Sequence, residues 1–273
     1  MWLLLKHSSN VPQCASVIQE IFVDAGMQDD IFKNIPIGSP KVAELIKDER
    51  VAAISFTGSS AAGCSTAELA GSCLKKTVLE LGGSDSFIVF DDADLKYTTD
   101  LAVKARMINN GQSYIAAKRF IITKDVFEEF EEKITHIVER LVVGNPLDMS
   151  TDIGPLARLD IVKQLDEQVK KSIDKGAIVL TGGKRPEDNP GFFYMPTVIS
   201  MVKKGMPVYD EETFGPVAAL IKVNDEKEAI RVANDTCYGL GASGERYMLW
   251  SWCKYLDKQC RKGRTMVKTF AGR

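Results

Sequence analysis

Strand-type and helix-type segments alternate along the first half of the chain, and this alternation restricts its fold more than any other feature. Residues 51–56 and 77–81 have the short apolar composition of strands, and we expect the first of them to be buried. Helical patterns begin at Pro12, where apolar residues recur every three or four positions as far as Gly26, and at Ser39-Pro40, where a serine cap precedes a proline. Strands joined through helices form parallel sheets. The sequence therefore predicts an α/β fold in which helices cover a parallel sheet.

The second half of the chain continues this pattern with longer elements. We expect strands at residues 87–90, 119–123 and 178–180 and around Val198, and helices at residues 94–109, 126–141 and 156–175. The first α/β unit passes into the second near Gly82-Gly83, which predicts one domain over residues 1–82 and another over residues 83–243. Residues 244–273 concentrate tryptophan, cysteine and basic side chains, so we expect a divergent C-terminal tail there.

Composition excludes several classes of function. The net charge of -2 gives no electrostatic reason to bind nucleic acid. No apolar run approaches the ~18 residues that a transmembrane helix needs, so we expect no membrane span. The six cysteines lack CxxC spacing, which predicts neither a disulfide framework nor a metal site. A reducing, cytoplasmic setting is therefore expected.

Three motifs could carry chemistry on their residues alone. Thr57-Gly58-Ser59 follows a strand and precedes a helix, so it is either a phosphate site at a helix N-terminus or a simple turn. Glu80 lies in an apolar strand that ends in two glycines. It is either a general base with a raised pKa or a surface residue. Glu211-Glu212 lies in a loop, where most acidic pairs are merely solvated.

These motifs occur together with others in one order and at a characteristic spacing. They are Phe56-Thr57-Gly58-Ser59, Glu80-Leu81-Gly82-Gly83, Gly111-Gln112 and Glu212-Thr213-Phe214-Gly215-Pro216. Over roughly residues 3–243 the chain resembles the aldehyde dehydrogenase family, and residues 6–12 are most similar to its succinate-semialdehyde dehydrogenase branch. The resemblance implies an aldehyde-dehydrogenase-like fold, with a partial Rossmann-type cofactor domain followed by an α/β catalytic domain.

The resemblance also implies a role for individual residues. Lys6 would hold the adenosine ribose or its 2′-phosphate, and Ser9 stands where the family often has a glutamate on that ribose. A neutral serine does not repel a 2′-phosphate, so the cofactor is expected to be NADP or NAD. Ser59 would contact the pyrophosphate. The resemblance further implies that Glu80 would activate the deacylating water. Glu212 would hold the nicotinamide ribose, and Phe214 would flank the nicotinamide ring.

Tyr114 stands where the family has its nucleophilic cysteine. It lies 34 residues after Glu80 (114 − 80 = 34), which is similar to the family's spacing between base and nucleophile. The family mechanism needs a thiolate that adds to the aldehyde. A phenol is only about 0.1% ionised at pH 7 and is bulkier than a thiol. The resemblance therefore implies a chain with little or no oxidising activity toward a small aldehyde.

A second interpretation remains open at this point. The family's chains extend further at both ends, so we expect a shortened cofactor domain and weakened nucleotide binding. Such a chain could instead be a non-catalytic nucleotide-binding or regulatory partner of an intact homologous aldehyde dehydrogenase subunit. Recovery of activity on Tyr114→Cys would favour the first interpretation, and co-purification with a full-length homologue the second.

Overall fold

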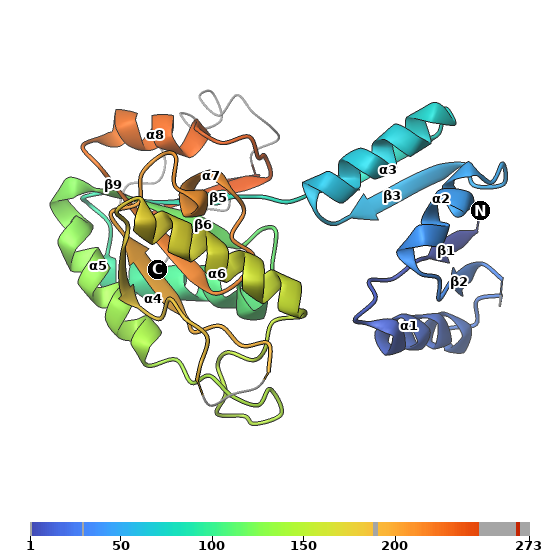
Figure 1. The fold of residues 1–273 in the computed structure, drawn as a ribbon, viewed down its shortest axis with the longest axis horizontal. Coiled ribbons are helices and arrows are strands. Elements are labelled where there is room, and N and C mark those ends of the chain that lie inside the picture. The colour runs from blue at the N-terminus through green and yellow to red at the C-terminus, as the bar shows by residue number, and fades with distance from the viewer. Residues whose placement is uncertain (1, 29, 188–190, 246–265, 268–273) are drawn as a thin grey trace. The chain divides into compact units, whose positions relative to one another are not determined.

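The chain forms two compact units, one over Met1–Leu81 and the other over Gly82–Arg273. A computed structural model describes residues 2–28, 30–187, 191–245 and 266–267, and Figure 1 shows their elements. Each unit has its own sheets and helices, so the two are considered separately.

The first unit contains two small parallel sheets with helices between their strands. Strand β1 (Leu3–Leu5) pairs with β2 (Phe32–Asn34), and β3 (Ala53–Thr57) pairs with β4 (Lys76–Glu80). The helices are α1 (Pro12–Asp24), the short 3₁₀ helix η1 (Ser39–Lys41), α2 (Val42–Lys47) and α3 (Ser60–Ser72). Each pair of strands is thus connected by a helical crossover, as the alternation in the sequence predicts.

Two expectations for this unit were wrong. Strand β3 is not buried: its residues alternate between exposed and half-buried, because β4 is its single partner in the described part of the chain. Ser39 does not cap a helix with its side chain. It is itself the first residue of η1, and the α-helix begins three residues later at Val42.

The second unit is built on one sheet with the order β11-β10-β5-β6-β9-β8-β7. All neighbouring strands are parallel except β7 and β8, which are antiparallel. The strands are β5 (Asp85–Val89), β6 (Ala117–Thr123), β7 (Ile178–Thr181), β8 (Thr197–Ser200), β9 (Val217–Val223), β10 (Gly241–Glu245) and β11 (Met266–Val267). The helices are α4 (Leu95–Met107), η2 (Ile108–Gly111), α5 (Lys124–Glu139), α6 (Leu159–Asp174), α7 (Pro207–Asp210) and α8 (Glu226–Asn234).

Helices cover both faces of this sheet, so its central strands are buried throughout. Along β5, Phe87 and Val89 pack with residues of α4 and α5, whereas Ile88 packs with residues of α6 and α8. Every residue of β5 and β6 is buried. Figure 1 shows α4 and α5 together along one side of the sheet, in green, with α6 crossing in front of the strands. A parallel sheet covered on both faces is what its continuous apolar strands require.

The predicted elements of this unit are present, with boundaries shifted by up to three residues. Helix α6, for example, begins at Leu159 rather than at residue 156. Strand β9 and helix α8 were not predicted. Strand β10 continues to Glu245, so the first two residues of the expected tail belong to the sheet. The rest of that tail lies outside the described residues, apart from β11. No helix in the described part of the chain is both long enough and apolar enough to cross a membrane.

Candidate active site and cofactor-binding residues

Ser59 and Glu80 lie at the carboxyl ends of two adjacent parallel strands. Thr57 is in register with Glu80, and the Gly58 amide donates to the Glu80 carbonyl oxygen at 3.0 Å. Ser59 is the N-cap of α3, where its hydroxyl accepts from the Ala62 amide at 3.3 Å. Ligands of open α/β sheets bind at this end of the strands, and the free amides of a helix N-terminus favour anions. The first unit therefore presents a cap that suits a phosphate, with an exposed carboxylate beside it.

Lys6 and Ser9 follow the carboxyl end of another strand of the same unit. Lys6 comes directly after β1 and is half-buried, whereas Ser9 is exposed in a turn. Neither side chain has a hydrogen bond in the described part of the chain. Both are therefore placed where a ligand could use them.

In the second unit, the loop before Tyr114 adopts a strained and closely packed path. Asn109 and Asn110 have positive φ angles of 51° and 55° within η2, and Gly111 follows with φ 73°. A side chain at Gly111 would lie 2.2 Å from the Gly215 carbonyl oxygen, so only glycine fits this approach. The Gly111-Gln112 segment is thus fixed against the loop that carries Glu212 and Phe214.

Arg106 connects these two loops through hydrogen bonds from its guanidinium group. Its side chain is fully buried at 0% exposure. It donates to the carbonyl oxygens of Ala117 (2.8 Å), Gly111 (2.7 Å), Thr213 (3.2 Å) and Gly215. Burial lowers the pKa of Arg106 to about 9, which leaves it charged near pH 7. One cation therefore satisfies carbonyl groups from three separate segments.

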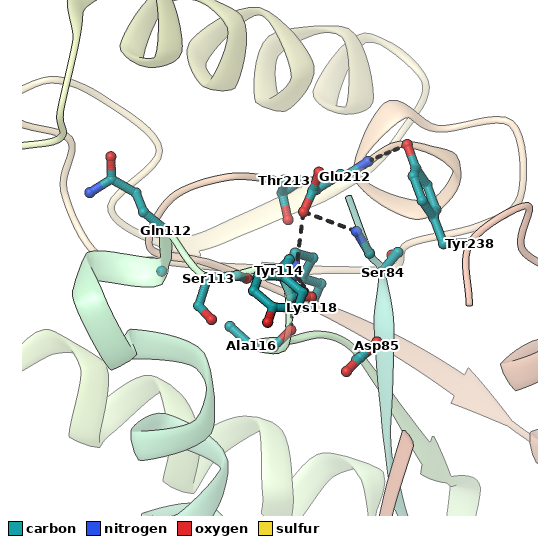
Figure 2. Close-up of polar contacts among 12 residues, drawn as sticks. Ser84, Asp85, Gln112, Ser113, Tyr114, Ala116, Lys118, Glu212, Thr213 and Tyr238 are labelled. Atoms are coloured by element: carbon teal, nitrogen blue, oxygen red, sulfur yellow. Dashed lines mark hydrogen bonds and ion pairs between the residues drawn. The ribbon is translucent and has the colours of Figure 1, made fainter. Parts of the chain in front are cut away.

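Lys118 holds the Tyr114 loop from the adjacent strand β6. Its ammonium group donates to the carbonyl oxygens of Ser113 (2.9 Å), Tyr114 (3.0 Å) and Ala116 (3.1 Å). The Tyr114 side chain is half-buried at the centre of this loop, and Figure 2 shows it beside Lys118. The backbone on both sides of Tyr114 is thus fixed by a single side chain.

Glu212 provides a carboxylate at this site. Its Oε1 accepts from the Gly83 amide at 3.1 Å and lies 3.7 Å from Lys118 Nζ. Its own amide donates to the Tyr238 hydroxyl at 3.3 Å, as the dashed lines in Figure 2 indicate. Gly83 has no room for a side chain, since a Cβ there would lie 2.7 Å from the Tyr114 carbonyl oxygen. Gly83, Tyr114 and Glu212 therefore form one local arrangement.

A second carboxylate, Asp85, faces the same group of charges. Burial raises its pKa to about 6, although nearby Lys118 opposes the shift. Burial also lowers the pKa of Lys118 to about 8, and repulsion by Arg106 acts in the same direction. The site thus contains ionisable groups whose pKa values are shifted so that the neutral form is favoured, as is common at functional sites.

The structure brings some of the expected site residues together and leaves the others in the first unit. Tyr114, Glu212 and the half-buried Phe214 share the second unit. Lys6, Ser9, Ser59 and Glu80 belong to the first. Three residues with clear structural roles, Arg106, Lys118 and Asp85, were not among the expected site residues. Lys118 directly precedes the expected strand 119–123, and the structure extends that strand to Ala117, so Lys118 lies within it.

Comparisons with known proteins agree with the motifs. The model of the aldehyde dehydrogenase family matches residues 2–244. A probable succinate-semialdehyde dehydrogenase (NADP+) of Synechocystis sp. is 50% identical over 240 residues, which are 88% of this chain and 53% of that protein. A succinate-semialdehyde dehydrogenase (NADP+) of Mycobacterium leprae is 47% identical and is covered to 52%. The chain spans about half the length of the curated relatives it matches.

Solved structures give the same result for the fold. The succinic semialdehyde dehydrogenase of Streptococcus pyogenes, in complex with NADP+, matches with a TM-score of 0.91 and 37% identity, over 97% of this chain and 58% of that one. These similarities identify the fold as that of an α/β oxidoreductase class. The chain belongs to the aldehyde dehydrogenase family. The predicted family and fold class are thereby confirmed.

Proposed function

We propose that this chain is a nucleotide-binding member of the aldehyde dehydrogenase family whose oxidising activity is blocked at Tyr114. The observation that supports the proposal is the position of Tyr114 at the centre of the loop between Gln112 and Lys118, whose backbone carbonyls are hydrogen-bonded by Lys118. In the family that position holds a thiol, which forms the bond to the aldehyde carbon. A phenol is a weak nucleophile near neutral pH, and it fills more of the space in which a small aldehyde would react.

We assign the cofactor to NADP, with NAD as the alternative. Lys6 and Ser9 would hold the adenosine ribose, because a lysine attracts a 2′-phosphate and a serine does not repel it. Ser59 would place the pyrophosphate at the N-terminus of α3, where the amides of Ser60 and Ala61 have no partner among the described residues. The relatives from Synechocystis and Mycobacterium leprae, which are named as NADP+ enzymes, support this assignment.

The nicotinamide half is assigned to two residues of the second unit. Glu212 would accept hydrogen bonds from the ribose, and Phe214 would flank the ring. When bound, the cofactor supplies the hydride acceptor of aldehyde oxidation. The chain's own residues would bind and orient it, while Glu80 would take a proton from a water molecule in the hydrolytic step. We propose a semialdehyde as the ancestral substrate and the cytoplasm as the location; the thiols of Cys14, Cys64, Cys73 and Cys237 are free, which suits a reducing compartment.

The proposal is tested by restoring the thiol. We expect Tyr114→Cys to raise NADP+ reduction with succinate semialdehyde by roughly 10³-fold or more over the unmodified chain, because a reactive thiol replaces an unreactive phenol. Tyr114→Ala is the matched control, since it removes the same bulk without adding a nucleophile. Absorbance of NADPH is the measurement.

Each result has a distinct meaning. Turnover in the unmodified chain would overturn the assignment of Tyr114 as the block. If no variant turns over but NADP+ still binds, Tyr114 is not the only block, and a nucleotide-binding role without catalysis remains. Absence of NADP+ binding in all three proteins would contradict the cofactor assignment itself.

A further inference from the structure

Lys118 is a buried cation whose hydrogen-bonding capacity is used entirely by one loop. Its side chain is 1% exposed, and its three donors end on the carbonyl oxygens of Ser113, Tyr114 and Ala116. An ammonium group has three donors and no acceptor. No donor of Lys118 is therefore left over for a hydrogen bond to Glu212.

The contact between Lys118 and Glu212 is consequently one of charge. Lys118 Nζ lies 3.7 Å from Glu212 Oε1, which also accepts the Gly83 amide at 3.1 Å. Both contacts fall on the same oxygen. Oε2 has no hydrogen-bond partner among the described residues, and the Glu212 side chain is 17% exposed. The carboxylate is thus anchored through one oxygen and presents the other.

Three further charged groups influence this pair. Arg106 repels Lys118, and Asp85 attracts it. Glu211 lies next to Glu212 in the chain, but it is exposed and accepts from the Gln168 amide at 2.9 Å. Lys118 is therefore the cation that faces Glu212 Oε1 directly, while Arg106 contacts the backbone of the same loop at Thr213 and Gly215.

We propose that Lys118 is a positioning residue that fixes Glu212 so that Oε2 accepts a hydroxyl group of the nicotinamide ribose. The Lys118 side chain contacts both the Glu212 carboxylate and the backbone around Tyr114. A ribose bound at Glu212 is therefore held at a fixed position relative to the Tyr114 loop. The ligand chemistry is that of a sugar hydroxyl donating to a carboxylate, which is a charge-assisted hydrogen bond. This inference rests on the proposed binding of the cofactor.

The test compares two nucleotides that differ in the part Glu212 would hold. NADP+ contains the nicotinamide ribose, whereas 2′,5′-ADP contains only the adenosine half. We expect Lys118→Met to weaken NADP+ binding by about 10-fold, the loss of roughly one charge-assisted hydrogen bond. Binding of 2′,5′-ADP should be unchanged. Isothermal titration calorimetry of the full chain measures both.

A double-mutant cycle separates positioning from general damage. If Lys118 acts through Glu212, then Lys118→Met should cause little further loss of NADP+ affinity when Glu212→Gln is already present. Additive losses would overturn the inference, as would equal loss of both nucleotides. Unmodified chain that binds 2′,5′-ADP with the same affinity as NADP+ would also overturn it. Failure to bind either nucleotide would instead contradict the proposed function.

The unmodified chain offers a second test if Lys118→Met does not fold. Burial lowers the pKa of Lys118 to about 8, so its charge is lost as the pH rises through that value. We expect NADP+ affinity to fall between pH 7 and pH 9.5 while 2′,5′-ADP affinity stays constant. Burial also lowers the pKa of Arg106, but a guanidinium keeps its charge over this range. A flat profile for NADP+ would overturn the inference.

Discussion

At the scale of single residues, two buried cations organise the site around Tyr114. Arg106 and Lys118 each donate to several backbone carbonyl oxygens, and most of these carbonyls lie in loops or at the ends of regular elements. Leaving a buried polar group without a partner costs about 1–3 kcal/mol. The cations therefore explain how irregular backbone can be packed inside the second unit.

Arg106→Lys tests the need for a planar, branched donor. A lysine keeps the charge but cannot reach carbonyls of Ala117, Gly111 and Gly215 together, because its single nitrogen replaces a fork. We expect the free energy of unfolding to fall by about 2–4 kcal/mol. Urea unfolding followed by circular dichroism measures the change.

Arg140→Lys provides the matched control, since Arg140 is exposed and its side chain has no hydrogen bond among the described residues. Its effect should stay within about 0.5 kcal/mol. Equal stability of the two variants would show that the fork of Arg106 is dispensable.

The site was only partly predictable from these residues. The motifs around Glu212 and Gly111 pointed to the loops that the structure brings together. The cations that join the loops were not expected, because their partners are backbone carbonyls, and carbonyls leave no pattern in a sequence. Burial of Lys118 could not be inferred either, because Lys118 stands beside Arg119 at the start of the expected strand.

At the scale of elements, the residue expected at the start of a helix caps it in one case and not in another. Asp94, where the sequence predicts a helix to begin, caps α4: its carboxylate accepts from the amides of Lys96 (3.1 Å) and Tyr97 (3.2 Å). Ser39 has the same kind of sequence signal, but its side chain makes no cap bond. A short 3₁₀ turn intervenes there, which a proline allows equally well. Cap chemistry thus predicts a helical start without deciding which helix forms.

Asp94→Ala should destabilise the second unit by about 1 kcal/mol, because two amides at the start of α4 lose their acceptor. The midpoint of urea unfolding reports the loss. Asp100→Ala, at an exposed position within the same helix, removes a carboxylate without removing a cap. If both substitutions had the same effect, the loss would be one of charge and not of capping.

At the scale of the whole molecule, the alternation in the sequence was sufficient to predict the class of fold. It predicted parallel sheets because neighbouring parallel strands need a crossover connection, which is usually a helix. It did not predict that β9 would lie between β6 and β8, since strand order depends on packing between segments far apart in the chain. Burial was mistaken at β3 for the same reason: a strand's apolar sequence does not state how many neighbours it has.

The difference between the sheets has a consequence for local opening. In β3 and β4 every position is exposed or half-buried, whereas β5 and β6 are buried along their whole length. Amide hydrogens exchange with solvent through local opening where few apolar contacts must break, and through global unfolding where many must. We expect the amides of β3 and β4 to exchange at least about 100-fold faster than those of β5 and β6, which mass spectrometry of deuterated peptides can measure.

Uniform protection across both sheets would contradict this expectation. If the gradient is present, the backbone around Ser59 and Glu80 opens and closes many times while strands β5 and β6 remain closed. The turn that suits a phosphate would then be a transient acceptor, formed for only a fraction of the time, whereas the strand that carries Lys118 would stay closed until the second unit unfolds.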